Sequence, residues 1–365
     1  MQKDFLDFND LSLTDWEQIY NLAEDIYNRP GEYTDRCKNK ILATLFYEPS
    51  TRTRFSTQSA MYKLGGNSIG FSQVYGSSVV KGESLKDTVK MVESYSDIIA
   101  IRHPKDGAAA AAALYSRVPV INAGDGKHLH PTQTLLDLFT IGKYKGFTGL
   151  NIGICGDLLN GRTAHSLLRA FDLYPGNNFY LISSPDFKMP ESYLENKNII
   201  INESINDCIS ELDIIYITLL QRERIDGTLA PLSDALILNK SKLINAKKDL
   251  LIMHPLPRNE EISTDIDEDP RAAYFKQAEF GLYIRMALLI ILLEGGLPPS
   301  LRDTPLTEGG RTKASLSEGG VSEADGGSEN CPNANCIIND KDDTSDLPRL
   351  INKDGTCAYC GIKIC

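Results

Sequence analysis

Residues 40–66 read KILATLFYEPSTRTRFSTQSAMYKLGG and join two structural patterns in one short segment. The first eight residues are almost continuously apolar, which is typical of a strand buried on both faces of a parallel sheet. Residues 50–53 then predict the start of a helix directly after the strand. A strand that passes at once into a helix is the repeating unit of α/β folds, so the segment indicates that fold class.

The same alternation continues along the chain. Further short apolar strands are expected in six segments, most of them separated by helical stretches: SDIIAIRH, VPVINAG, GLNIGICGD, NNFYLISS, DIIYITLL and DLLIMHPL. A helix in LSLTDWEQIYNLAEDIYNRP, capped by Ser12 or Thr14, is expected near the N-terminus. The pattern predicts an α/β protein with two doubly wound parallel-sheet lobes and a ligand cleft between them, at the carboxyl ends of the strands.

Changes in composition divide the chain into four segments. A helix that begins near residue 130 ends in glycine near 146 and a new strand begins near 149, so the lobes are expected at 1–147 and 148–297. Residues 298–330 are rich in Gly, Ser and Glu, which predicts a flexible linker with little fixed structure. Residues 331–365 carry five of the eight cysteines and form the fourth segment.

The charge balance limits the possible partners. The 365 residues have a formal net charge of -11, which argues against nucleic acid and anionic membranes as partners because both require a basic face. No signal peptide is recognised, and the longest apolar run, MALLIILL at 286–293, is far shorter than the ~20 residues that span a bilayer. We expect a soluble, cytoplasmic protein whose anionic ligands meet a local concentration of Arg and Lys.

Hydroxyl and guanidinium groups gather at the helix start after the first strand. Ser50, Thr51 and Thr53 alternate with Arg52 and Arg54. A helix N-terminus binds anions and arginine offers paired donors to a phosphate, so the segment is a candidate phosphate site. A helix cap beside two solvated arginines is the equal alternative.

A second candidate site follows the strand VPVINAG. His130 precedes Pro131 at a helix start, where an imidazole can donate to a developing oxyanion and Gln133 can orient an amide. A plain helix cap is the alternative for His130, and His128 is expected to be an exposed loop residue. Arg102 and His103 end another strand at the same edge of the sheet.

Three weaker signals complete the set. Ser77, Lys81 and Glu83 lie in a loop where a lysine could close over an anion, and Arg162 lies at a helix start after a glycine turn. The glycines of that turn do not follow the dinucleotide-binding order. MHPLPR, at 253–258, could present backbone carbonyls to a ligand amine. Each signal has a plain structural alternative, a solvated loop or a rigid turn.

The cysteine pattern of the last segment predicts a metal site. Cys331 and Cys336 are separated by four residues, and Cys357 and Cys360 by two. Four closely paired thiolates suit a closed, structural Zn²⁺ site, and all five histidines lie outside this segment. Disulfides are the less favoured alternative in a chain with no export signal, and Cys365 is left as a free thiol.

STRTR (50–54), HPTQ (130–133) and HPLPR (254–258), taken together and in this order, resemble the aspartate carbamoyltransferases over about residues 5–296. The resemblance implies transfer of a carbamoyl group from carbamoyl phosphate to L-aspartate in pyrimidine synthesis, with no catalytic cofactor. HPLPR favours the aspartate branch over the ornithine branch of the family.

The resemblance also implies roles for individual residues. Phosphate would be bound by Ser50, Thr51, Arg52, Thr53 and Arg102, and the carbamoyl oxygen by Thr53, Arg102 and His130. The carbamoyl NH₂ would face Gln133 and the carbonyls of Leu256 and Pro257. Aspartate would be bound by Arg162 and Gln221, and Ser77 and Lys81 would reach in from a neighbouring subunit of a trimer, where Lys81 would act in both catalysis and aspartate binding.

The segment around the cysteines, CPNANC and CAYC, resembles the zinc module of the regulatory chain of these enzymes. It implies a fusion of catalytic chain and zinc module without the nucleotide-binding effector domain. The module is expected to dock on a catalytic lobe, in its own chain or in a neighbouring chain, and to assist assembly.

One position departs from the family pattern T-R-x-Q-x-E-R after the strand DIIYIT. Leu219 stands where the family has an arginine for the second aspartate carboxylate. Loss of such a contact costs on the order of a few kcal/mol unless another cation, Arg222 or Arg224, replaces it. The alternatives are a carbamoyltransferase for a different amine and a catalytically weak assembly protein; the intact phosphate-site residues argue against the latter.

Overall fold

The computed structural model describes residues 4–219, 233–295, 321–323, 331–340, 347, 350–352 and 355–363. The chain divides into two compact units, residues 1–132 with 282–365, and residues 133–281. This division differs from the expected boundary near 147, because helices α5 (Pro131–Tyr144) and α7 (Tyr274–Leu293) each contribute residues to both units. No helix among the described residues is long and apolar enough to cross a bilayer.

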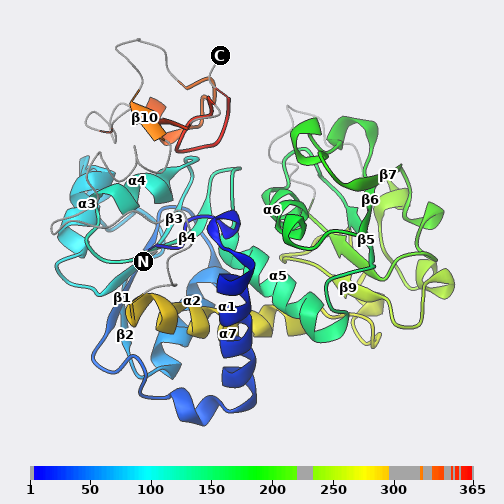
Figure 1. The fold of residues 1–365 in the computed structure, drawn as a ribbon, viewed down its shortest axis with the longest axis horizontal. Coiled ribbons are helices and arrows are strands. Elements are labelled where there is room, and N and C mark those ends of the chain that lie inside the picture. Colours follow the sequence, from blue (N-terminus) through cyan, green and yellow to red (C-terminus); the bar gives the residue numbers. More distant parts are fainter. Residues whose placement is uncertain are drawn as a thin grey trace. The chain divides into compact units, whose positions relative to one another are not determined.

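The first unit is built on a four-stranded parallel sheet in the order β2-β1-β3-β4 (Figure 1). Its strands are β1 (Ile41–Phe46), β2 (Asn67–Phe71), β3 (Ile98–His103) and β4 (Val120–Asp125). Its helices, apart from the parts of α5 and α7, are α1 (Leu13–Asn28), α2 (Thr51–Lys63), α3 (Leu85–Val92) and α4 (Ala108–Tyr115). The N-terminal helix is capped by Ser12, one of the two predicted caps, through a reciprocal bond with Asp15.

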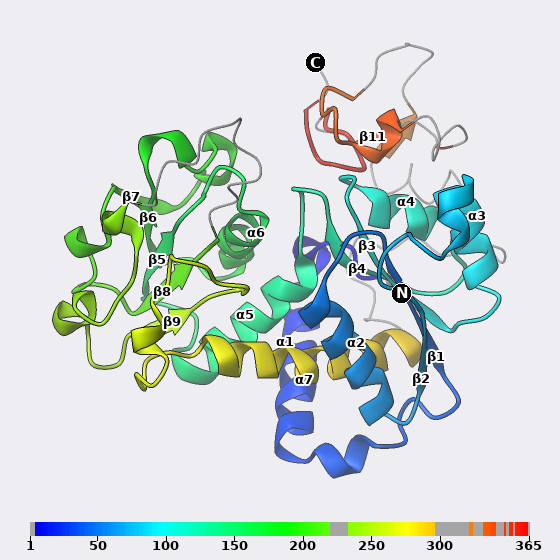
Figure 2. The ribbon, with the colours of Figure 1, turned by 180° about the vertical axis from the view of Figure 1, so that it is seen from behind.

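The second unit contains a five-stranded parallel sheet in the order β7-β6-β5-β8-β9 (Figure 2). Its strands are β5 (Asn151–Cys155), β6 (Asn178–Ile182), β7 (Asn198–Asn202), β8 (Ile214–Ile217) and β9 (Leu251–Met253). Helix α6 (Arg162–Ala170) follows β5. Two parallel-sheet α/β units confirm the predicted fold class.

Two strands of the parallel sheets were not predicted from the sequence, β2 and β7, and both lie at sheet edges. β2 and β7 are mostly exposed or half-buried, whereas β4 and β8 are fully buried. β4 and β9 also end their sheets, but each has a backbone bridge on its outer side, to Phe5 and to Ala272, and each is buried. The hydrophobic pattern therefore found the buried strands and passed over the two exposed ones, because a strand that faces solvent needs no long apolar run.

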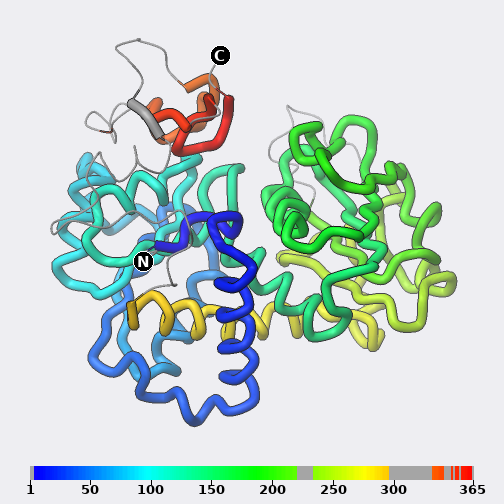
Figure 3. The backbone as a smooth tube through the Cα atoms, viewed as in Figure 1, coloured from blue at the N-terminus to red at the C-terminus, as the bar shows by residue number. Residues whose placement is uncertain are grey.

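The cysteine-rich tail packs against the first unit beside α4 (Figure 3). Cys331, Cys336, Cys357 and Tyr359 are buried in one apolar cluster with the alanines of α4. The alanine side chains of α4 are short, so another segment can approach the backbone of this helix closely. Within the expected linker, most of which lies outside the described residues, Val321–Glu323 form strand β10, which pairs antiparallel with β11 (Leu350–Asn352).

Candidate functional site

Three side chains from separate segments meet at the carboxyl edge of the first sheet. Thr53 lies in the first turn of α2, Arg102 lies in β3, and His130 lies between β4 and α5. Nε2 of His130 is 3.5 Å from Oγ1 of Thr53 and 3.4 Å from Nη1 of Arg102. A guanidinium group can only donate, so Nε2 accepts in that contact, which suits the tautomer with its hydrogen on Nδ1. The structure thus brings together the three residues assigned to the carbamoyl oxygen.

The hydroxyl of Ser50 is not used as a helix cap. Ser50 is the N-cap residue of α2, but its side chain accepts no capping hydrogen bond. Thr51 and Arg52, in the first turn of α2, are exposed. Ser50 thus holds the N-cap position without a capping side-chain bond, and the exposed Arg52 fits both the anion site and the helix-cap alternative.

An acidic residue that was not predicted from the sequence, Glu48, also lies at this edge of the sheet. Oε1 of Glu48 is 2.7 Å from Nη2 of Arg102, and both side chains are largely buried. Glu48 stands two residues before Ser50, at the end of a predicted strand. Its position at a strand end could have marked Glu48 as a candidate site residue. Its contact with Arg102 depends on the sheet order, because β1 and β3 are neighbours.

Lys81 is the last residue of a short 3-10 helix, η3 (Ser78–Lys81), and Ser77 is the N-cap residue of that helix. The hydroxyl of Ser77 donates to the carbonyl of Val74 at 2.7 Å, and Lys81 is exposed. Glu83 accepts from Thr88 at 2.9 Å, so it ties this segment to α3. The segment is more regular than the expected loop.

A buried carboxylate organises the loop that precedes His130. Asp125 accepts from the backbone N–H of Gly107 at 2.7 Å, the backbone N–H of Leu129 at 3.1 Å and the side chain of Asn122 at 3.1 Å. Burial acts to raise the pKa of Asp125, but His128 and these donors outweigh it and lower the pKa below its ordinary value.

His128 is not the exposed loop residue expected from the sequence. Its side chain is 19% exposed, and its Nδ1 lies 3.2 Å from Oδ2 of Asp125. Burial acts to lower the pKa of His128, but the Asp125 carboxylate raises it overall. His103 also departs from the expectation of a side chain at the cleft. It is buried, accepts from the backbone N–H of Lys105, and burial lowers its pKa to about 4.

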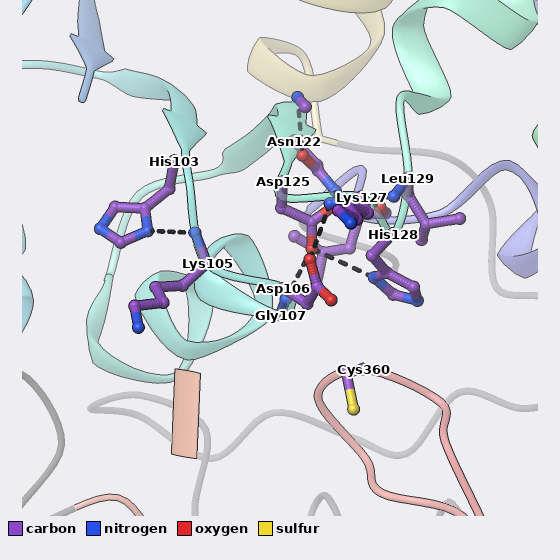
Figure 4. Close-up of polar contacts among 12 residues, drawn as sticks. His103, Lys105, Asp106, Gly107, Asn122, Asp125, Lys127, His128, Leu129 and Cys360 are labelled. Carbon is purple, nitrogen blue, oxygen red and sulfur yellow. Dashed lines mark hydrogen bonds and ion pairs between the residues drawn. The ribbon is translucent and has the colours of Figure 1, made fainter. Parts of the chain in front are cut away.

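The carboxylate of Asp106 contacts both this loop and the tail, and Figure 4 shows Asp106 beside the residues of the loop. Asp106 accepts from the backbone N–H of Lys127 at 2.8 Å, from Nδ2 of Asn333 at 2.8 Å and from Nδ2 of Asn335 at 3.0 Å. Backbone hydrogen bonds from Asp106 to the carbonyl of Asn335, and from Ile337 to the carbonyl of Asp106, continue the contact. The predicted docking of the tail on a catalytic lobe thus takes a definite form, within one chain.

The four cysteines of the tail are close enough to share one metal ion. Their sulfur atoms all lie within 4.8 Å of one another. Sγ of Cys331 is 3.5 Å from Sγ of Cys360, and Sγ of Cys336 is 3.8 Å from Sγ of Cys357. Sulfur atoms at about 2.3 Å from a tetrahedral zinc ion would be about 3.8 Å apart. The cysteines are free thiols, so the arrangement fits a metal ion better than disulfides.

In the second unit, Gln133 belongs to a buried polar network. Its Nε2 donates to Oδ1 of Asp137, one helical turn later on α5, at 2.8 Å. The hydroxyl of Tyr216, on β8, donates to Oδ2 of Asp137 at 2.8 Å. Burial, followed by the carboxylate of Asp137, raises the pKa of Tyr216 well above its ordinary value, so this hydroxyl remains a donor. Asp137 was not predicted from the sequence, although residues four apart on a helix lie side by side and its spacing from Gln133 could have indicated the contact.

The HPLPR turn is held by its histidine. Nδ1 of His254 accepts from the backbone N–H of Leu256 at 2.7 Å, so Nε2 carries the hydrogen and donates to Glu261 at 2.9 Å. Leu256 has a left-handed backbone conformation, with φ at 54°, that apolar residues rarely adopt. Burial acts to raise the pKa of Glu261, but the bond from His254 and backbone donors lower it overall. The next basic residue, Arg258, pairs with Asp267.

The structure describes some of the residues expected to bind aspartate but not all of them. Arg162 begins α6, as the sequence predicted. Leu219 is half-buried two residues after the end of β8, beside the buried Thr218. The predictions for Gln221, Arg222 and Arg224, and for the free thiol Cys365, fall outside the described residues.

Two family models match consecutive parts of the chain. The carbamoyl-phosphate-binding domain of aspartate/ornithine carbamoyltransferases matches residues 3–143, and their aspartate/ornithine-binding domain matches residues 148–292. The chain is 50% identical over 299 residues to a protein of Clostridium novyi named aspartate carbamoyltransferase catalytic subunit, covering 80% of this chain and 98% of that one.

Solved structures agree with these matches. The catalytic subunit of M. jannaschii aspartate transcarbamoylase is 40% identical with a TM-score of 0.75, covering 80% of this chain and 98% of that one. The Trypanosoma cruzi aspartate transcarbamoylase in complex with carbamoyl phosphate and aspartate is 34% identical with a TM-score of 0.74, covering 79% and 95% of the two chains.

Docking of the tail can be tested at Gly107. In Gly107→Ala the new Cβ would lie 2.6 Å from both Cβ and the carbonyl oxygen of Tyr359, so the tail must move off α4. We expect proteolysis within the tail to become about tenfold faster, because each ~1.4 kcal/mol of lost docking energy is a factor of ten.

Gly146→Ala is the matched control. Gly146 has a φ of +78°, against +82° at Gly107, and nothing lies within 4 Å of its new Cβ. Both variants therefore carry the same backbone strain, and only Gly107→Ala carries the clash. Equal proteolysis rates in the two variants would contradict docking at Gly107.

Proposed function

Because the chain belongs to the aspartate and ornithine carbamoyltransferase family, we propose that it transfers the carbamoyl group of carbamoyl phosphate to L-aspartate. The amine nitrogen forms a bond to the carbamoyl carbon, the bond from that carbon to the phosphate oxygen breaks, and phosphate leaves with the electron pair. The proton that the amine gives up is taken up by the departing phosphate. The product, N-carbamoyl-L-aspartate, belongs to pyrimidine biosynthesis. The convergence of Thr53, Arg102 and His130 is the observation that supports this proposal most directly.

The first unit would bind the phosphate and the carbamoyl oxygen. Donors from the start of α2 and from β3 would hold the phosphate: Ser50, Thr51, Arg52, Thr53 and Arg102. Charge builds on the carbamoyl oxygen and on the leaving phosphate during transfer, so fixed donors lower the barrier. Thr53 and Arg102 would donate to that oxygen. Once the oxygen replaces Nε2 of His130 as the acceptor of the Arg102 guanidinium, Nε2 would carry the hydrogen and donate as well. The proximity of the bound reactants would supply much of the remaining acceleration.

The second unit would bind the carbamoyl NH₂ and the acceptor. Oε1 of Gln133 and the carbonyls of Leu256 and Pro257 would accept from the NH₂ group. Arg162 and Gln221 would bind aspartate. Ser77 and Lys81 would come from a neighbouring subunit, which makes a trimer the working unit; their position on a short, exposed helix is compatible with that role.

The tail would be a structural zinc module of the kind found in regulatory chains. The sulfur distances support four thiolate ligands: Cys331, Cys336, Cys357 and Cys360. A zinc ion bound there would hold the tail segments in one fold, and Asp106 would hold the module on its own catalytic unit. The chain would then combine catalytic and zinc-binding parts that other members of the family carry on separate chains.

A second candidate function is carbamoyl transfer to an amine without the second carboxylate. The half-buried Leu219 favours it, because an apolar side chain at this position cannot neutralise that carboxylate. The assay that separates the two candidates supplies carbamoyl phosphate with a panel of amino acids. We expect carbamoylaspartate at millimolar or lower aspartate concentrations. No product from aspartate alongside product from another amine would favour the second candidate, and no product from any amine would refute both.

Leu219→Arg tests the assignment of this position. An arginine there is expected to lower the KM for aspartate by about tenfold or more, because a charge-assisted contact is worth about 1.5–3 kcal/mol. Leu219→Met keeps an apolar side chain of similar size and serves as the control. An unchanged aspartate KM in Leu219→Arg would contradict the assignment.

Metal analysis tests the module. Protein purified without chelator is expected to contain one zinc ion per chain, and Cys357→Ser is expected to abolish it, because a closed site needs all four ligands. Cys208→Ser is the control, since Cys208 is a buried thiol of the second unit. Zinc-free wild-type protein would refute the module.

A further inference from the structure

Asp137 is a buried carboxylate between two amide side chains. It is 0% exposed, and its Oδ1 accepts from Nε2 of Gln133 at 2.8 Å and from Nε2 of Gln277 at 2.6 Å. Gln277 lies on α7 and is 1% exposed. The hydroxyl of Tyr216 occupies the other oxygen, Oδ2, at 2.8 Å. Three donors from three elements of the second unit thus meet one carboxyl group.

This contact fixes which end of each amide faces the carboxylate. An ionised carboxylate can only accept hydrogen bonds, so both glutamines must present their NH₂ groups to it. Their oxygen atoms are then forced to point away from Asp137. The orientation of Gln277 is also fixed at its other end, because the backbone N–H of His254 needs an acceptor and finds it in Oε1 of Gln277.

The oxygen of Gln277 is used to hold the HPLPR turn. Oε1 of Gln277 accepts from the backbone N–H of His254 at 3.0 Å, and His254 in turn accepts from the backbone N–H of Leu256. Asp137 is therefore linked through two side chains to the backbone at Leu256. The oxygen of Gln133 makes no hydrogen bond within the described residues, and Gln133 is 8% exposed.

We propose that Asp137 is a positioning residue that selects carbamoyl phosphate by fixing the acceptors for its NH₂ group. It turns Oε1 of Gln133 toward the substrate and, through Gln277, holds the turn that carries the Leu256 carbonyl. The proposal rests on the proposed function, which assigns these acceptors to the carbamoyl NH₂. A reversed Gln133 would present its own NH₂ to the substrate NH₂, where two donors cannot bond.

Selectivity for carbamoyl phosphate over acetyl phosphate follows from the difference between an NH₂ group and a methyl group. Acetyl phosphate has the same phosphate and carbonyl as carbamoyl phosphate but has CH₃ in place of NH₂. A site with oriented acceptors disfavours it, because those acceptors lose their partners when the methyl group binds. A site with misoriented amides loses that preference.

The test measures two constants in one assay of carbamoylaspartate formation: the KM for carbamoyl phosphate and the inhibition constant Ki for acetyl phosphate as its competitor. The ratio of Ki to KM reports discrimination and does not depend on how much of the enzyme is folded. In Asp137→Leu, which keeps the branched shape but has no acceptor, we expect this ratio to fall about tenfold, the equivalent of one hydrogen bond.

Asp137→Asn is the conservative variant. Because both glutamines bond to Oδ1, an asparagine can keep its oxygen toward them and turn its NH₂ toward the Tyr216 hydroxyl. We expect the ratio to stay within about twofold of the wild type. Thr140→Val removes another buried hydrogen bond of α5, from Oγ1 of Thr140 to the carbonyl of Leu136, which involves neither Asp137 nor the glutamines. It therefore controls for a general loss of stability and is expected to leave the ratio unchanged.

Gln277→Met tests the link to the turn separately. It keeps the bond between Asp137 and Gln133 but removes the acceptor for the N–H of His254, so we expect a smaller fall in the ratio, about threefold. A wild-type ratio in both Asp137→Leu and Gln277→Met would overturn the proposal and leave Asp137 a structural residue. A wild-type enzyme that forms no carbamoylaspartate would instead refute the proposed function.

Discussion

Parallel pairing of β1, β3 and β4 is the constraint on which the first unit depends. Neighbouring parallel strands end at the same edge of a sheet, so segments that follow different strands are brought together there. Thr53 follows β1, Arg102 ends β3 and His130 follows β4. A strand order in which β1, β3 and β4 were not neighbours would separate them. The same geometry also brings Glu48 to Arg102, an ion pair that no local pattern suggests.

Buried carboxylates give the loops their fixed conformations. Asp125 binds the segment before His130, Asp137 binds two glutamines, and Glu261 binds the histidine of the HPLPR turn. A buried charge is costly unless several donors surround it, so each of these acids holds a particular arrangement of backbone and side chains. Only one arrangement satisfies all donors at once, and for that reason such groups specify geometry as well as stability.

The tail shows how a small segment can dock on a larger unit. It contributes cysteines and Tyr359 to a core cluster with the alanines of α4, and its asparagines bind Asp106. Asp106 also binds the backbone of Lys127, in the loop that leads to His130. Gly107 permits the close approach, since a Cβ there would collide with Tyr359. Small residues and one shared carboxylate are therefore sufficient to define the contact.

The sequence by itself determined the α/β class, the buried strands, the starts of α2, α5 and α6, and the cysteine cluster, because these depend on local periodicity and short spacings. It did not reveal the exposed edge strands β2 and β7, because β2 has no apolar run and the run in β7 is only three isoleucines long. It also assigned His128 to an exposed loop, although Asp125 holds it in a buried pair. Only the tertiary structure decided the positions of these strands, the environment of His128, and the hydrogen-bond partners of Asp106 and Asp137. Their hydrogen bonds join residues from separate elements, and a linear pattern carries no information about which elements become neighbours.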